Sequence, residues 1–146
     1  MFQSKKPEYR VLVCGGRDYG KRWDEHLSEF ILDTHLVHNL HAILKDIKDT
    51  RVPEGYELVI VHGAARGADS MASTWARSQH VKEMPFPADW SGGRSGGIQR
   101  NIQMLEDSEP SLVVAFPGGA GTAHMVSLAR KTKTPLMVIE DEDSQD

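Results

Sequence analysis

The stretch Ser111–Val126, SLVVAFPGGAGTAHMV, begins with a short apolar run and continues with three glycines within four residues. The apolar run is typical of a buried strand, and Met125, Val126, Leu128 and Ala129 then follow at helical spacing. Glycine tolerates positive φ and lets another molecule approach the backbone closely. We therefore expect a strand, a glycine-rich turn and a helix, with a ligand near the turn.

Other short apolar runs indicate further strands. Arg10–Cys14 and Glu57–Val61 are rich in valine and end close to glycine, and 135–140 (PLMVIE) has the same character. Val81–Phe86 is a weaker candidate. Nearly continuous apolar strands are typical of a parallel sheet that is covered on both faces.

Helical patterns separate these strands. Helical spacing recurs at Met71, Ala72, Trp75 and Ala76, and again at Ile98, Ile102 and Leu105. Trp23–Lys48 is also helical in pattern and is long enough for two helices. This alternation predicts a single α/β, Rossmann-like, doubly wound domain with a mostly parallel sheet of about five strands.

Composition sets the class of protein. The 146 residues fit one domain, which we place at 10–140 between an N-terminal tail, 1–9, and an acidic tail, 141–146. No apolar run is long enough to span a membrane, the N-terminus lacks the apolar core of a secretory signal, and the one cysteine suits the reducing cytoplasm. A net charge of -4 argues against binding to a nucleic-acid backbone.

Three glycine-bearing turns follow predicted strands: CGGRDYG, HGAARGAD and FPGGAGT. If the strand order is 3-2-1-4-5, these turns line one crevice at the carboxyl edge of the sheet, where doubly wound folds bind ligands. Helix N-termini there offer unpaired N–H groups and a partial positive charge, which suit a phosphate.

Several residues are candidates for this site. Arg94 and Trp90 lie in the long loop PADWSGGRSGG, where the arginine can close over a ligand and the indole can stack on a base. The residues that we expect to bind the ligand are Gly15, Gly16, Arg17, Asp18, His62, Gly63, Arg66, Gly67, Asp69, Arg100, Asn101, Pro117, Gly118, Gly119, Gly121 and Thr122.

The chemistry is open at this point. Asp18, Asp69 and His124, which we place in the first turn of its helix, are candidates for an acid or a base, and each can equally serve as a polar contact or a cap. Cys14 ends a buried strand, where a core thiol is the default. His35, His38 and His41 lack companions for a recognisable metal site, so we expect no metal and no cofactor.

The motifs GGRDY, HGAARGAD, GGIQRNIQML and FPGGAGTAHMV, in this order, resemble the YspA-like (cpYpsA-related) branch of the SLOG superfamily. That superfamily also contains the LOG phosphoribohydrolases and the DNA-processing protein DprA. The resemblance implies a Rossmann-like domain that binds nucleotides or nucleotide-derived ligands, such as ADP-ribose, with Asn101 in its RNxxML motif.

The chain also departs from its relatives. LOG-like hydrolases continue as PGGxGTxxE, whereas Ala123, His124 and Met125 follow Thr122 here. The resemblance therefore favours a sensor or sequestering module for a nucleotide-derived ligand. An N-glycosidic hydrolase of the LOG type is the alternative, and single-stranded DNA binding of the DprA type is a third, against which the acidic balance argues.

The segment from Lys21 to about Leu40 resembles an insertion relative to short members of this branch. Its apolar residues exceed what a compact five-stranded domain needs, and exposed apolar surface usually marks an interface. We therefore expect a homo-oligomer that uses this segment.

Overall fold

The computed structural model describes residues 5–141, so residues 1–4 of the expected N-terminal tail and 142–146 of the expected acidic tail lie outside the described residues. Five parallel strands form one sheet in the order β5-β4-β1-β6-β7, and a separate hairpin pairs β2 with β3. The elements are β1 (Glu8–Cys14), β2 (Lys21–Asp24), β3 (Glu29–Leu32), α1 (Thr34–Thr50), β4 (Glu57–His62), α2 (Ala68–Ser78), β5 (Lys82–Pro85), α3 (Ser95–Ser108), β6 (Leu112–Ala115), α4 (Ala120–Lys131) and β7 (Leu136–Val138).

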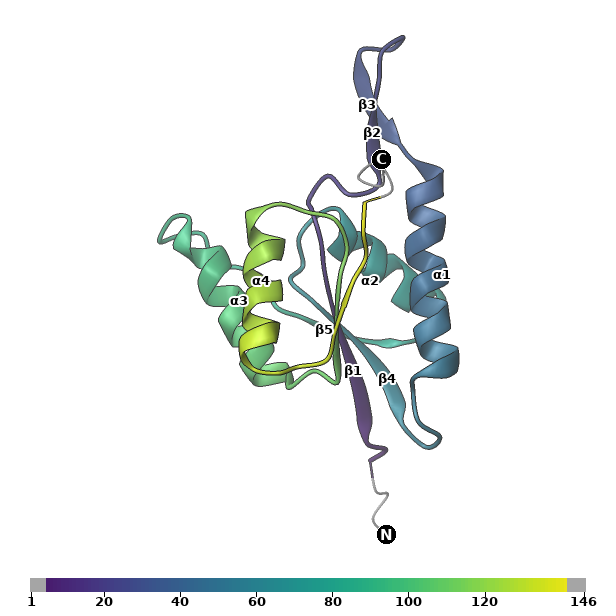
Figure 1. The fold of residues 1–146 in the computed structure, drawn as a ribbon, viewed down its shortest axis with the longest axis vertical. Helices are drawn as coiled ribbons and strands as arrows, with labels where there is room; N and C mark the ends of the chain where they lie inside the picture. Colours follow the sequence, from purple (N-terminus) through teal and green to yellow (C-terminus); the bar gives the residue numbers. More distant parts are fainter. Residues whose placement is uncertain (1–4, 142–146) are drawn as a thin grey trace.

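The helices cover the sheet on both faces, with α1 and α2 on one side and α3 and α4 on the other (Figure 1). Successive side chains of β1 point to opposite faces of the sheet and so contribute to the hydrophobic cores on both sides. Val11 and Val13 pack with α1 and α2, while Leu12 and Cys14 pack with α3 and α4. This two-sided burial explains why the central strands carry continuous apolar runs, such as residues 11–14 (VLVC), and not alternate apolar residues.

The sheet confirms the expected fold class. Numbered within the five-stranded sheet alone, its order is 3-2-1-4-5, and β1 pairs in parallel with both β4 and β6. The direction of winding therefore reverses between β1 and β6. The first strand begins at Glu8, so two residues that we assigned to the N-terminal tail belong to the sheet.

The helical expectation for Trp23–Lys48 was wrong in its first third, where β2 and β3 form an antiparallel hairpin before α1 begins. Trp23, Leu27, Phe30 and Ile31 have helical spacing by coincidence. Local bonds select the hairpin instead, since Asp24 Oδ1 accepts from Leu27 N in the turn at 2.9 Å. Asp33 caps α1 by accepting from the N–H groups of His35 and Leu36, which starts the helix after the hairpin.

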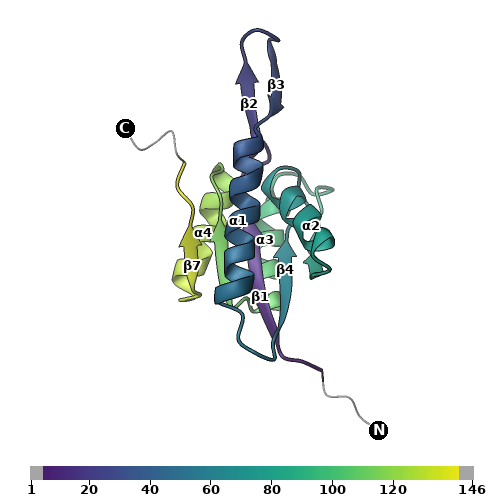
Figure 2. The same cartoon turned by 90° about the vertical axis from the view of Figure 1, so that its right-hand side faces the viewer.

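The hairpin stands away from the sheet beyond the N-terminus of α1 (Figure 2). A bond of 2.7 Å from Asp33 N to Gly20 O joins its two ends at the base. No helix among the described residues is long and apolar enough to cross a membrane.

Gly67 supports a first prediction, because it has a φ of +80° and a Cβ there would meet the backbone of Gly16 and Arg17. We expect Gly67→Ala to lower the free energy of unfolding by about 2 kcal/mol or more, since strain and overlap with backbone add up. Gly55 is the matched control, with a φ of +86° and open space around it. Gly55→Ala should cost only the ~1 kcal/mol of the left-handed backbone.

Urea denaturation of both variants measures this difference. Equal losses at the two positions would show that the turns do not interlock at Gly67.

Candidate functional site

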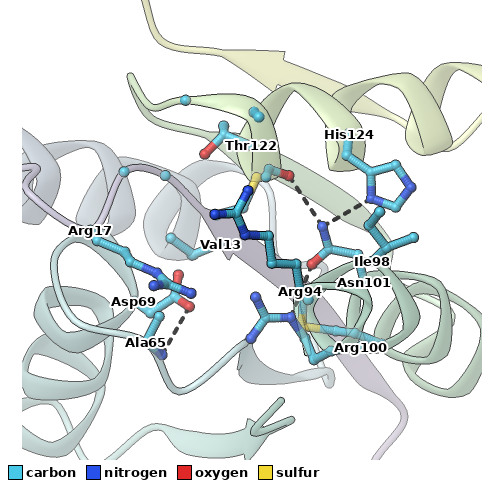
Figure 3. A pocket seen from close by; sticks show the side chains of 18 of the residues that line it. Val13, Arg17, Ala65, Asp69, Arg94, Ile98, Arg100, Asn101, Thr122 and His124 are labelled. Atoms are coloured by element: carbon cyan, nitrogen blue, oxygen red, sulfur yellow. Dashed lines mark hydrogen bonds between the residues drawn. The ribbon is translucent and has the colours of Figure 1, made fainter. Parts of the chain in front are cut away.

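A cavity of about 550 Å³ opens at the carboxyl edge of the sheet, beside the point where the winding reverses (Figure 3). Its walls come from the end of β1 and the turn after it, the turn after β4, the start of α2, the loop before α3, α3 itself, and Gly119 with the first turns of α4. The lining residues are Val13, Cys14, Gly15, Gly16, Arg17, Ala65, Asp69, Trp90, Arg94, Gly97, Ile98, Arg100, Asn101, Met104, Gly119, Ala120, Gly121, Thr122 and His124.

The three glycine-bearing turns touch one another beside this cavity. Gly16 N donates to Pro117 O at 2.9 Å, and Gly16 O accepts from Ala68 N at 3.2 Å. The turn after β1 is therefore bonded both to the turn after β6 and to the start of α2. The sequence-based expectation that these turns meet is confirmed by these bonds.

Glycines of the FPGGAGT turn have two different surroundings. A Cβ on Gly118 would overlap the backbone of Gly15 and Gly16 and the Thr122 hydroxyl, so this glycine is needed for packing. A Cβ on Gly119 or Gly121 would meet nothing within 4 Å, and both residues line the cavity. Only these two leave backbone open to a ligand.

The N-terminus of α4 faces the cavity. The helix begins at Ala120 after the N-cap Gly119, and no side chain caps it. Thr122, which we expected to start the helix, is therefore its third residue, and His124, which we expected in the first turn, is its fifth. The first N–H groups of a helix have no partner within the helix and carry a partial positive charge.

Arginine side chains reinforce this positive character. Arg17, Arg94 and Arg100 come from three different segments and reach the same space (Figure 3). Asp69 is the one carboxylate among the lining residues. The cavity is thus locally basic although the whole chain has a net charge of -4.

Arg100 connects two segments of the cavity wall through its guanidinium group. Its Nη1 donates to Gly63 O at 2.5 Å, and its Nε donates to Asn101 Oδ1 at 3.0 Å. Burial lowers the pKa of Arg100, and the charge of Asp69 opposes that effect. Arg100 thus ties α3 to the turn after β4.

The bonds of Asn101 fix the proton position of His124. Because Arg100 donates to Oδ1, the amide nitrogen of Asn101 is the donor on the other side, where it reaches Gly121 O and His124 Nδ1, each at 3.1 Å. An imidazole nitrogen that accepts a bond carries no proton, so neutral His124 holds its proton on Nε2. His124 therefore presents a hydrogen-bond donor, not a base.

Asp69 lies in the first turn of α2 and is buried against the cavity. Its Oδ2 accepts from Gly63 N at 3.1 Å and from Ala65 N at 3.3 Å, so it shapes the turn after β4. Burial raises the pKa of Asp69, opposed by the hydrogen bond from Ala65, the charges of His62 and Arg100, and the hydrogen bond from Gly63.

Burial also raises the pKa of Cys14 to about 12, so this thiol is protonated and is no nucleophile at neutral pH.

Trp90 covers one side of the cavity. The Arg17 guanidinium carbon lies 5.0 Å from the centre of its ring. A Cβ on Gly97 would overlap the ring, and a Cβ on Gly96 would overlap Asp89 O, so these two glycines let the loop settle on the start of α3. The indole is thereby held between α3 and Arg17, with part of its face exposed.

The structure brings together part of the expected site. Of the ligand-binding candidates, the cavity is lined by Gly15, Gly16, Arg17, Asp69, Arg100, Asn101, Gly119, Gly121 and Thr122, with His124 beside them. Those outside its lining are Asp18, His62, Gly63, Arg66, Gly67, Pro117 and Gly118.

Those outside have other partners or positions. His62 Nε2 bonds Glu83 Oε1 at 2.9 Å, and its Nδ1 accepts from Ala64 N at 3.0 Å, so both ring nitrogens are occupied by protein. Arg66 pairs with Asp18 at 3.5 Å on the exposed surface. Arg66 and Gly63 line a smaller cavity of about 290 Å³, which shares Arg17 and Trp90 with the first.

Sequence reasoning missed the apolar part of the lining, namely Val13, Ala65, Gly97, Ile98, Met104 and Ala120. The expected apolar stripe of α3 was wrong at Ile98, which is 52% exposed, and at Ile102. The buried positions include Asn101 and Met104 instead. The positions 97, 101 and 104 share a helix face, and a polar residue on that face was the signal of a site.

Among residues 5–141, no group of three histidine, cysteine, aspartate or glutamate side chains is placed to hold a metal ion. His35, His38 and His41 of α1 are among these residues.

Asp69 supports a prediction about pH. Because folding raises the pKa of this acid, its contribution to stability is fully present below its unfolded pKa of ~4 and is lost as pH rises through the folded pKa. Asp69→Asn keeps an oxygen that accepts from Gly63 N and Ala65 N and removes the titration. We expect the free energy of unfolding of the parent chain, minus that of Asp69→Asn, to fall as pH rises from about 4.

Chemical denaturation at a series of pH values gives this difference. A difference that stays constant or rises over that range would contradict the raised pKa.

Comparison with known proteins gives a family and a relative. Residues 9–93 match the YspA, cpYpsA-related SLOG family. The Gene 61 protein of Mycobacterium phage D29 is 38% identical over 143 residues, which cover 90% of this chain and 97% of that protein.

Solved structures with low identity share the fold. The X-ray structure of TM1055, a Northeast Structural Genomics Consortium target, has a TM-score of 0.62 at 15% identity and covers 88% of this chain and 72% of its own. A UDP-N-acetylglucosamine 2-epimerase has a TM-score of 0.53 at 12% identity, covering 96% of this chain and 36% of its own. The UDP-GlcNAc 2-epimerase from Neisseria meningitidis, bound to UDP-GlcNAc, has a TM-score of 0.50 at 16% identity and covers 90% of this chain and 32% of its own.

Proposed function

This chain belongs to the YspA, cpYpsA-related SLOG family, and we propose that it binds a nucleotide or a nucleotide-derived ligand of the ADP-ribose kind as a sensor or sequestering module. The observation that carries this proposal is the uncapped N-terminus of α4, where Gly119 and Gly121 leave the backbone open. A phosphate fits such a helix end, since it accepts from the free N–H groups and meets the positive end of the dipole.

The surrounding side chains suit the rest of such a ligand. Arg17 and Arg94 are free to pair with phosphate oxygens, whereas Arg100 is engaged as a brace. Trp90 and Ile98 offer apolar surface on which a base can stack. Both described hydrogen bonds to Asp69 reach Oδ2, so Oδ1 is the oxygen that can meet a ribose hydroxyl.

The size and shape of the cavity favour a small ligand over a polymer. Its volume of about 550 Å³ lies within the usual range for small-molecule sites. Single-stranded DNA would need a groove that follows its backbone. Here the three arginines that line the cavity converge on one space instead of forming a stripe. This convergence favours the binding of a nucleotide over the binding of single-stranded DNA.

Ligand-dependent stability tests the proposal. A nucleotide present at about 100 times its dissociation constant should stabilise the folded chain by ~2.7 kcal/mol. Thermal denaturation with AMP, ADP-ribose, NAD and cyclic derivatives should show a rise in Tm with at least one of them. No rise with any of these, together with a rise caused by an unrelated metabolite, would remove the nucleotide proposal.

Gly119→Val tests whether the ligand approaches the backbone of the FPGGAGT turn. A side chain there points into open space, so the fold should persist while the ligand loses its approach to the backbone. Circular dichroism should match the parent, and the ligand-induced rise in Tm should disappear. Gly118→Ala is the control for the packing role, because it should lower Tm without ligand.

Cleavage of an N-glycosidic bond is the second candidate function, and Asp69 is the observation that favours it. A buried carboxyl with a raised pKa, facing the cavity, is a group that can donate a proton. No second group completes the chemistry, because His124 Nδ1 already accepts from Asn101 and Met125 stands where LOG-like hydrolases have glutamate.

We therefore expect little or no release of free base from AMP, cytokinin-type nucleotides or NAD. Loss of a positioned acid or base typically costs ~10²–10⁴-fold in rate. Chromatography of the incubated nucleotides gives the measurement. Turnover that vanishes in Asp69→Asn or His124→Ala, while the ligand still raises Tm, would make the chain an enzyme and overturn the binding-module proposal.

A further inference from the structure

The β2–β3 hairpin has one apolar face and one charged face. Strand register places Trp23 opposite Phe30 and Lys21 opposite Leu32, and these four side chains share one face. Arg22 opposite Ile31 and Asp24 opposite Glu29 form the other face.

The apolar face has no cover within the described chain. Trp23 is 52%, Phe30 64% and Leu32 61% exposed, and Leu27 in the turn is exposed as well. The two aromatic rings lie 5.2 Å apart in an edge-to-face arrangement, so they already form a compact cluster. An isolated two-stranded hairpin is marginally stable in water, so a surface that covers the apolar face would stabilise this one.

The charges of the hairpin are separated along its length. Lys21 lies at the base of the apolar face and Glu25 follows β2 in the turn at the tip, whereas Arg22, Asp24 and Glu29 belong to the other face. Such a hairpin is complementary to a second copy of itself that runs in the opposite direction. Glu25 of each copy then lies near Lys21 of the other, and the two apolar faces lie against each other.

We propose that this face of the hairpin is a homodimer contact, in which two hairpins pack face to face and antiparallel about a two-fold axis. A two-fold axis makes the same patch serve both partners, so a surface that is complementary to itself meets the requirement. The proposal does not depend on the nucleotide site.

The size of the patch sets the strength of the dimer. Two half-exposed aromatic rings and two exposed leucines supply on the order of 400 Å² of apolar surface on each copy. Two such patches together fall below the ~1,200 Å² of standard stable interfaces, in the range of weak, reversible contacts. We therefore expect an equilibrium between monomer and dimer that depends on concentration.

Sedimentation velocity from low to high micromolar concentration tests the proposal. The parent chain should shift from monomer to dimer with increasing concentration, and Trp23→Thr/Phe30→Thr should stay monomeric. Threonine retains strand propensity, so the hairpin itself is preserved. Ile31→Thr on the opposite face is the matched control, and it should dimerise like the parent.

Charge exchange tests the antiparallel arrangement. Lys21→Glu and Glu25→Lys should each weaken the dimer at least severalfold, because each places like charges together across the contact. The double variant Lys21→Glu/Glu25→Lys restores opposite charges and should regain the parent affinity. In a parallel arrangement each residue would meet its own copy, and the double variant would show no recovery.

Three results would overturn the proposal. The first is a parent chain that stays monomeric at every concentration, and the second is a dimer that persists in Trp23→Thr/Phe30→Thr. The third is a monomeric parent chain that sediments with phosphatidylserine-containing vesicles, which would assign the apolar face to a lipid surface. Circular dichroism of every variant verifies that the fold is retained.

Discussion

The backbone N–H and C=O of Gly16 join the three glycine-bearing turns at the site. Its N–H donates to Pro117 O after β6, and its carbonyl accepts from Ala68 N at the start of α2. These two bonds fit only because a Cβ is absent at Gly15, Gly67 and Gly118, where one would overlap neighbouring atoms at 2.6 Å or less. The glycine motifs are therefore first a packing requirement of three turns that meet.

The interlock explains why so few glycines remain for a ligand. With the turn after β1 held in place, the N-terminus of α4 is aimed at the cavity, and Gly119 and Gly121 are the positions that stay open. Arg17 leaves the same β1 turn and meets Trp90 from the loop before α3. The site is thus assembled from segments far apart in the sequence, each positioned by backbone bonds.

The sheet could be predicted from the sequence because buried parallel strands leave a strong mark, a continuous apolar run that ends at glycine. The hairpin could not be predicted, because Trp23, Leu27, Phe30 and Ile31 imitate a helical stripe, and the bond from Leu27 N to Asp24 Oδ1 that decides the turn has no periodicity. The same limit applied to α3, where the isoleucines are exposed and an asparagine is buried. Residue type predicted burial poorly wherever a face borders a cavity.

Some of the candidate residues expected from the sequence line the cavity, and others do not. Turn residues such as Arg17 were identifiable, because strand ends in this topology share one edge. His62 also ends a strand, yet its ring lies between Glu83 and Ala64, a contact with β5 that no local pattern encodes. Side-chain direction at a strand end depends on the neighbouring strand, and that neighbour is known only once the sheet is formed.

The proton position of His124 distinguishes a binding role from a catalytic role better than the identity of the lining residues does. Arg100 fixes the amide of Asn101, the amide occupies His124 Nδ1, and the imidazole then offers an N–H toward its free side. A donor at this position, beside an uncapped helix end and arginines, suits an anion, and Nδ1 is occupied by the Asn101 amide instead of facing a water molecule. The charge pattern of the cavity therefore supports the proposed binding of a phosphorylated ligand over the proposed alternative of glycosidic cleavage.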